Sequence, residues 1–292
     1  MDHQLKRIHI ETSTVCNTDC LICPQALIRR PKKIDVARVK RLIAEDALVY
    51  KNTLDLFEFH NYNEPLLYFD LFCELSELVN GIYGTERVGL VTNASVMDAA
   101  KVGRLLTLGL KHVIFSVDGF SKAIYEAHRP GLDRDEVYGN IDHFIDRSAA
   151  VGGPVPLINY VVTEANAKDK DAARAHFQGR RCVFHMSACD GRGEDGGKLT
   201  AIRNMASACP CDYALDGAYI LSNLDLVACC EDWSGREILG NLKNHTLQEI
   251  VDGPAYGRFR DLHFAGRKRE IAVCRDCKTN MSYADNDLKT VR

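Results

Sequence analysis

The chain has 292 residues, of which 46% are apolar and 26% are charged, as in a folded globular protein with one large domain and a smaller appendage. A net charge of −3 excludes the basic excess typical of nucleic-acid-binding proteins, and no apolar run reaches the length of a membrane span. Residues 1–7 contain no signal-peptide core, so we expect a cytoplasmic location.

The first predicted element is a short strand over residues 7–12, and a cysteine-rich loop follows it. This loop holds Cys16, Cys20 and Cys23 in a CxxxCxxC arrangement. Three closely spaced thiolates can bind three irons of a [4Fe–4S] cluster and leave the fourth iron open for another ligand. Zinc sites, in contrast, usually take two separated cysteine pairs. The spacing therefore favours an iron–sulfur site.

Strand-like and helix-like segments alternate after this loop. Strands are predicted over residues 56–60, 88–92, 112–117, 158–162 and 182–186. Helices are predicted near residues 35–47, 66–80, 95–108, 134–151 and 166–177. A capping box, Ser95-Val96-Met97-Asp98, is expected to open the third of these helices. The predicted fold class is α/β, with a parallel sheet of about six strands curled into a partial (β/α)6 barrel.

The cysteine loop and the βα units resemble the radical S-adenosylmethionine (SAM) superfamily. The resemblance implies that Cys16, Cys20 and Cys23 bind a [4Fe–4S] cluster, whose open iron is chelated by the amino and carboxylate groups of SAM. The backbone of Ile22 would then face the adenine. The implied reaction cleaves SAM to a 5′-deoxyadenosyl radical, which removes a hydrogen atom from a substrate.

Polar residues at the ends of successive predicted strands match the expected SAM site. By resemblance, Glu64 accepts the methionyl ammonium of SAM, although Asn63-Glu64-Pro65 is also a plausible strand-to-helix turn. Thr92 and Asn93 end one strand, and Ser116 and Asp118 lie at the end of the next. The last two residues would bind the ribose or the carboxylate, with helix capping as the alternative role.

The pattern changes at a glycine-rich segment, residues 190–197, which predicts a hinge between domains 1–200 and 201–292. Arg192 in this segment is expected to bind the carboxylate of SAM or a substrate oxygen. Residues 191–196 also match GxGxxG. A dinucleotide site is rejected, because the segment lacks an opening βα turn and its two acidic residues would repel a pyrophosphate.

The second part of the chain carries a second set of cysteines. Two short strands over residues 218–221 and 224–228, a helix capped by Thr246 and a terminal CxxC resemble the SPASM module or its shortened twitch form. The resemblance implies one auxiliary [4Fe–4S] cluster. Its expected ligands are Cys211, Cys229, Cys274 and Cys277, with Cys209 as the alternative to Cys211. A zinc site with the same ligands is the competing interpretation.

The segment 60–67, Arg192 and the interval between Cys211 and Cys229 resemble the radical SAM enzymes of aminoglycoside biosynthesis, which include both dehydrogenases and epimerases. The expected substrate is a polar small molecule, an aminoglycoside or aminosugar. An external electron donor of the flavodoxin or ferredoxin type is expected as well, and no nucleic acid or membrane partner.

Cys230 is the expected catalytic residue. Its thiol would lie beside the auxiliary cluster and return a hydrogen atom to the substrate radical, so the predicted reaction is an epimerisation. A twitch-type dehydrogenase that oxidises a secondary alcohol is the alternative. A peptide-modifying enzyme is disfavoured because the chain has no evident spare length for a leader-binding domain, and a non-catalytic electron-transfer or zinc-binding protein is the remaining possibility.

Overall fold

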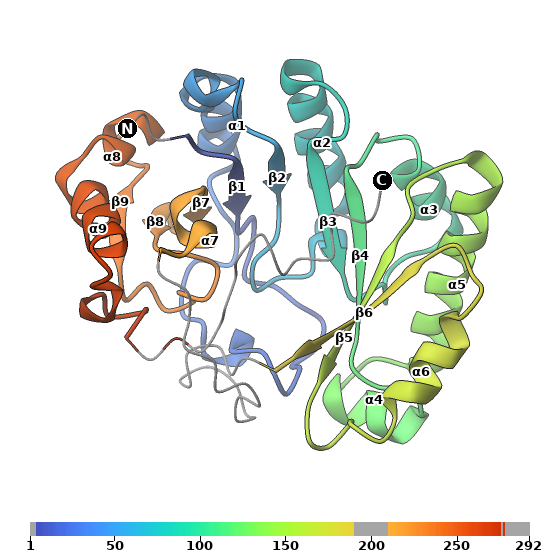
Figure 1. Ribbon diagram of the computed structural model, residues 1–292. Coiled ribbons are helices and arrows are strands. Elements are labelled where there is room, and N and C mark those ends of the chain that lie inside the picture. The colour runs from blue at the N-terminus through green and yellow to red at the C-terminus, as the bar shows by residue number, and fades with distance from the viewer. Residues whose placement is uncertain (1–3, 190–209, 276, 278–292) are drawn as a thin grey trace.

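A single mixed sheet organises the molecule. The computed structural model describes residues 4–189, 210–275 and 277 (Figure 1). Its nine strands run in the order β6-β5-β4-β3-β2-β1-β7-β8-β9. The strands are β1 (Arg7–Ile10), β2 (Leu56–Glu58), β3 (Val88–Thr92), β4 (His112–Val117), β5 (Leu157–Val162), β6 (Val183–Ala188), β7 (Gly217–Ile220), β8 (Asp225–Val227) and β9 (Ile238–Asn241).

Strands β1 to β6 are all parallel and curve into an open arc with helices on its outer side (Figure 1). These helices are α1 (Val36–Ala44), α2 (Phe69–Tyr83), α3 (Ala99–Leu105), α4 (Lys122–His128), α5 (Arg134–Val151) and α6 (Lys170–Phe177). The later part of the chain adds α7 (Asp212–Leu215), α8 (Leu247–Val251) and α9 (Pro254–Phe264). Short 3-10 turns occupy Gln25–Leu27, Asp46–Tyr50, Pro65–Tyr68 and Lys268–Glu270. The predicted α/β fold with a partial barrel is thus confirmed.

The hydrophobic core lies between the outer face of the sheet and the helices. Phe115 on β4 and Phe144 on α5 are fully buried and meet with their ring centroids 5.2 Å apart. Burial of one such side chain stabilises the fold by about 1.5–3 kcal/mol. Because this outer face takes the large apolar side chains, the inner face of the arc is left free for polar ones.

Two local expectations need correction. The cap of α3 is Asp98, whose side chain accepts a hydrogen bond from the backbone N–H of Lys101, and Ser95 lies outside the helix. Helix α4 was not predicted, because its seven residues are too few to show a clear amphipathic period. The predicted capping box at Thr246 is present, with Glu249 as the reciprocal partner.

The auxiliary segment continues the sheet of the barrel. Strand β7 pairs in parallel with the free edge of β1, with Ile10 opposite Ile220, and β8 and β9 then follow antiparallel. A buried ion pair reinforces this junction, because Arg30 binds Glu11 in a bidentate manner and Glu11 also accepts the backbone N–H of Ser222. The expected domain boundary near residue 200 lies outside the described residues. Among the described helices, none combines the length and the apolar character needed to cross a membrane.

Candidate active site

A cavity of about 1820 Å³ runs along the inner face of the sheet. It reaches from the loops after the strands, including Cys16 and Asn93, to residues at the strand beginnings, such as Lys6 and Lys111. Sites for a single small ligand usually measure about 300–1,000 Å³. The cavity therefore has room for two small molecules side by side.

The three cysteines of the first loop line this cavity together with Ile22. A backbone hydrogen bond anchors the loop to the end of α4, because the N–H of Leu21 donates to the carbonyl of His128 at 3.0 Å. Burial raises the pKa of the Cys16 thiol to about 12. A buried thiol with so high a pKa becomes a thiolate when a metal centre replaces its proton, so these residues fit an iron–sulfur cluster.

Glu64 forms a second polar centre beside this loop. Its carboxylate is 2% exposed and accepts hydrogen bonds from Thr92 Oγ1 at 2.7 Å and from the backbone N–H groups of Asn93 and Leu66 at 2.8 and 3.0 Å. Burial raises the pKa of Glu64 above its ordinary value in spite of these bonds. A buried carboxylate of this kind favours a cationic ligand, which would restore the charge balance. Glu64, Thr92 and Asn93 all line the cavity, as the sequence predicts for one site.

The two residues expected at the end of β4 have different environments. Ser116 lines the cavity, whereas Asp118 is not among its lining residues and is 1% exposed. Asp118 instead forms a 2.7 Å ion pair with Arg129 and accepts the backbone N–H of Val161. Arg129, at the end of α4, does line the cavity. The sequence analysis missed it because it belongs to no motif.

The thiols of the auxiliary segment gather around Cys274. Burial raises the pKa of Cys274 to about 12, and the nearby thiols of Cys277 and Cys211 add to the effect. Burial likewise raises the pKa of Cys229 well above its ordinary value, with Cys274 among the contributing neighbours. The four expected auxiliary ligands are therefore neighbours in space. The alternative ligand Cys209 lies outside the described residues, and so does Arg192.

The number of expected auxiliary ligands matches what an iron–sulfur cluster needs. A [4Fe–4S] cube takes one thiolate on each iron, so its ligands do not converge on a common atom. Cys274 is buried and Cys211, Cys229 and Cys277 are half-buried, and four neighbouring thiols fit that donor set.

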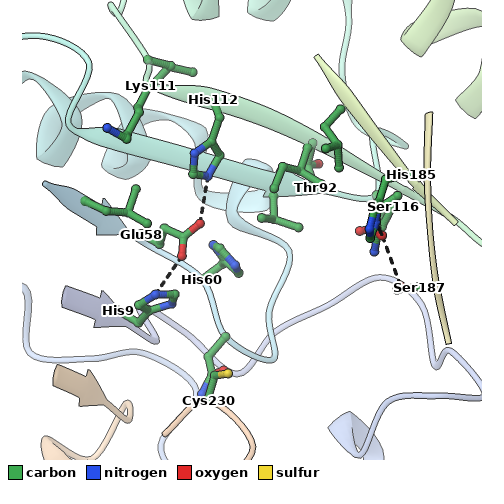
Figure 2. A pocket seen from close by; sticks show the side chains of 18 of the residues that line it. His9, Glu58, His60, Thr92, Lys111, His112, Ser116, His185, Ser187 and Cys230 are labelled. Carbon is green, nitrogen blue, oxygen red and sulfur yellow. Dashed lines mark hydrogen bonds and ion pairs between the residues drawn. The ribbon is translucent and has the colours of Figure 1, made fainter. Parts of the chain in front are cut away.

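Cys230 lines the same cavity from the auxiliary side (Figure 2). The hydroxyl of Tyr62 donates a hydrogen bond to the Cys230 carbonyl, which fixes the backbone at this point. The thiol lies 3.9 Å from a carboxylate oxygen of Glu231, another lining residue. The cavity thus connects the first cysteine loop with the neighbour of an auxiliary ligand.

The inner face also carries a cluster of ionisable side chains that the sequence analysis missed. Glu58 contacts His9 Nε2 at 2.9 Å through one oxygen and His112 Nε2 at 3.0 Å through the other (Figure 2). His60 extends into the same part of the cavity. Further along, Asn159 accepts a hydrogen bond from Ser187 and contacts His185. No local motif marks these residues, because they come together only through strand pairing.

Comparisons with known proteins agree with this geometry. Residues 10–168 match the radical SAM superfamily, and residues 209–278 match an iron–sulfur cluster-binding domain, SPASM. The chain is 22% identical to the S-adenosyl-L-methionine-dependent 2-deoxy-scyllo-inosamine dehydrogenase of Niallia circulans, over 95% of this chain and 94% of the relative.

Solved structures show the same fold. BtrN in complex with AdoMet and 2-DOIA superimposes with a TM-score of 0.66 at 17% identity and covers 96% of this chain and 95% of its own. SuiB of Streptococcus suis bound to the precursor peptide SuiA gives a TM-score of 0.70 at 16% identity, over 96% of this chain and 72% of its own. The two domain matches imply SAM, its [4Fe–4S] cluster and an auxiliary iron–sulfur cluster as cofactors. This chain is a member of the radical SAM superfamily with a C-terminal SPASM-type iron–sulfur domain.

Proposed function

We propose that the protein is a radical SAM dehydrogenase that oxidises a secondary alcohol on a small, polar, amino-bearing molecule of the aminoglycoside type. One observation carries the proposal: a single cavity is lined both by Cys16, Cys20 and Cys23 and by Cys230, the neighbour of the expected auxiliary ligand Cys229. A substrate in this cavity would lie between the site of hydrogen abstraction and an electron acceptor.

The proposal assigns a role to each group of residues. Cys16, Cys20 and Cys23 would hold the first cluster, with Ile22 along the adenine and Glu64 on the ammonium group of SAM. A cluster bound there would supply the electron that cleaves SAM, and a flavodoxin- or ferredoxin-type protein would deliver that electron. Cys211, Cys229, Cys274 and Cys277 would hold the auxiliary cluster, which would take up the second electron of the oxidation.

Dehydrogenation replaces epimerisation as the preferred reaction. The similar protein of Niallia circulans is named as a dehydrogenase. Epimerisation remains a second candidate because Cys230 lines the cavity, where its thiol could donate a hydrogen atom to the substrate radical. The two reactions differ only in what becomes of that radical.

Product analysis in deuterated water separates the two candidates. The reconstituted enzyme is incubated anaerobically with SAM, reductant and a panel of aminocyclitols, aminoglycosides and short peptides. The proposal predicts one ketone per 5′-deoxyadenosine, no solvent deuterium on the oxidised carbon, and an unchanged product from Cys230→Ala. Inversion of a carbon with one deuterium incorporated, lost in Cys230→Ala, would establish the epimerase instead. Stimulation by peptides alone would contradict both.

A further inference from the structure

The cluster around Glu58 is a row that crosses the sheet in register. His9 on β1 pairs with Glu58 on β2, Glu58 pairs with Gly89 on β3, and Gly89 pairs with His112 on β4. Partners in register on parallel strands point to the same face, which here is the inner one. Four neighbouring strands thus place one carboxylate, two imidazoles and one glycine in a single line.

Gly89 is what allows His112 to reach Glu58 across β3. A Cβ atom on Gly89 would overlap with Nε2 of His112 and would lie 3.0 Å from a carboxylate oxygen of Glu58. Any other residue at position 89 would therefore push His112 away. With glycine there, His112 reaches across β3 and contacts Glu58 at 3.0 Å.

The row is buried in its middle and more open at one end. The side chain of Glu58 is 7% exposed and that of His112 is 19% exposed. Next to His112, Lys111 forms a 2.9 Å ion pair with Asp55, and both lie at the rim of the cavity on the side where the strands begin. The opposite side of the cavity carries the SAM residues. The row therefore connects the interior with solvent on the side remote from SAM.

His60 connects this row to the substrate region. It follows β2 two residues after Glu58, so its side chain points to the same face (Figure 2). Burial pushes the pKa of Glu58 up, but the imidazoles of His9, His60 and His112 outweigh burial and bring that pKa well below its ordinary value. Arg7 on β1 and Tyr213 on α7 are also near this carboxylate, whose charge contributes to raising the pKa of both side chains.

We propose that His60 takes the proton of the substrate hydroxyl and that Glu58, flanked by His9 and His112, relays it to solvent at the N-terminal side of the barrel. This inference rests on the proposed dehydrogenation. Once a hydrogen atom has left the carbinol carbon, the resulting radical still holds an O–H bond. That bond breaks, the proton goes to a nitrogen of His60, and one electron goes to the oxidised auxiliary iron–sulfur cluster, which leaves a C=O bond.

A relay answers a physical need of this site. SAM and substrate must exclude water from their end of the cavity, because a primary carbon radical would otherwise be quenched. A proton released there needs a route that does not pass through the radical chemistry. Histidine is the side chain that gains and loses a proton most readily near neutral pH, which suits it to this task. His60 is therefore the catalytic residue, because it takes the proton from the substrate, whereas Glu58 and His112 contribute by moving that proton on from His60.

Three variants test the relay in the holoenzyme. Glu58→Gln removes the charge and keeps the shape, His60→Gln removes the first acceptor, and Gly89→Ala keeps every titratable group but displaces His112. The matched control is His143→Gln, an exposed histidine on α5 outside the cavity. Iron content, circular dichroism and SAM binding verify that each variant is folded and loaded.

We expect all three variants to form 5′-deoxyadenosine in the first turnover, because hydrogen abstraction needs no base. Formation of the ketone should slow by about 10²–10⁴-fold in His60→Gln, and less in Glu58→Gln and Gly89→Ala. Electron paramagnetic resonance of freeze-quenched samples should show a carbon-centred substrate radical that accumulates in the variants. The acid limb of the pH–rate profile should disappear in His60→Gln.

A second measurement needs no turnover. Imidazole ¹⁵N resonances of the oxidised holoenzyme should show the ring nitrogens of His9 and His112 in contact with the Glu58 carboxylate, and both resonances should shift in Glu58→Gln while that of His143 does not. Ketone formation at the wild-type rate in Glu58→Gln and Gly89→Ala, or His9 and His112 resonances that do not change in Glu58→Gln, would overturn the relay. Failure of the proposed function is a separate result, because the wild-type enzyme itself would then yield no ketone.

Discussion

Two buried, oppositely charged side chains lie next to the first cysteine loop. Arg129 and Asp118 are 5% and 1% exposed and form an ion pair at 2.7 Å. The pair supports the cysteine loop from below, since the neighbouring His128 carbonyl accepts the N–H of Leu21. Two buried charges gain their stability from each other, so the loss of one leaves the other without compensation.

Arg129→Met should therefore destabilise the fold by about 3–5 kcal/mol, because it leaves the Asp118 carboxylate buried and unpaired. The double variant Asp118→Asn/Arg129→Met should recover most of this loss, since the introduced side-chain amide is uncharged and its oxygen can still accept the N–H of Val161. Anaerobic urea unfolding in the absence of SAM measures both effects. Arg147→Met, an exposed arginine on α5, is the matched control and should change little. Equal stability of Arg129→Met and the control would refute the role of the pair.

At the level of secondary-structure elements, most of the site residues lie at the ends of strands or just before helices. Helix α3 begins after the segment 92–95. Thr92 and Asn93 in this segment are two of the three donors to Glu64. The segment also contacts the cysteine loop, because Ser95 Oγ accepts a hydrogen bond from the side chain of Asn17. The helix itself is capped by Asp98. The hydrogen bond from Lys101 N–H lowers the pKa of Asp98 below its ordinary value of 3.8.

Asp98→Ala should lower the free energy of unfolding by about 1 kcal/mol, the usual cost of losing an N-cap, while Asp98→Asn keeps the acceptor and should lose much less. Because the folded-state pKa is lowered, the contribution of the charge is present above pH 3.8 and is lost as the pH falls below that value. Chemical denaturation between pH 7 and pH 3.5 measures both trends. A difference between Asp98→Ala and the wild type that grew on acidification would contradict this sign.

How much of this arrangement the sequence predicts depends on whether the determining signal is local. The strands β1 to β6 and the loop of Cys16 were predictable because short apolar runs and thiol spacing are local patterns. The sequence predicted the start of α3 at Ser95, three residues before the true cap Asp98, because Ser95 offers an equally good local motif. Arg129 was not predictable because it belongs to no motif, and the row through Glu58 was not predictable because it depends on pairing between strands that are far apart in the sequence. Gly89 shows this most clearly, because its importance comes entirely from His112 on the neighbouring strand.

At the scale of the whole molecule, two sets of thiols share one rigid sheet. The first follows β1, and the second flanks β7 and β8, with Cys211 before and Cys229 after these strands. Strand β7 is hydrogen-bonded to β1 along its full length. The spacing between the two cofactor sites is therefore set by strand pairing rather than by a linker.

Two clusters per chain should give about eight irons after anaerobic reconstitution, since each [4Fe–4S] cluster holds four. Cys274→Ser should remove about half of this iron and retain SAM cleavage, whereas Cys16→Ser should remove the other half together with SAM cleavage. Iron and sulfide analysis with Mössbauer spectroscopy measures the outcome. Cys182→Ser, a cysteine apart from both sets, is the control and should keep all the iron. Four irons in the wild type, with zinc bound, would refute the auxiliary cluster.

The pairing of β1 with β7 also sets an order of events during synthesis. In the sequence 206 residues lie between the two strands (after Ile10 and before Gly217), yet the strands form one continuous edge-to-edge contact. A chain that leaves the ribosome N-terminus first completes β2 to β6 while that edge of β1 still has no partner. The auxiliary side of the cavity therefore forms after the barrel strands, so the interior that must finally exclude water and oxygen stays open until β7 has been made.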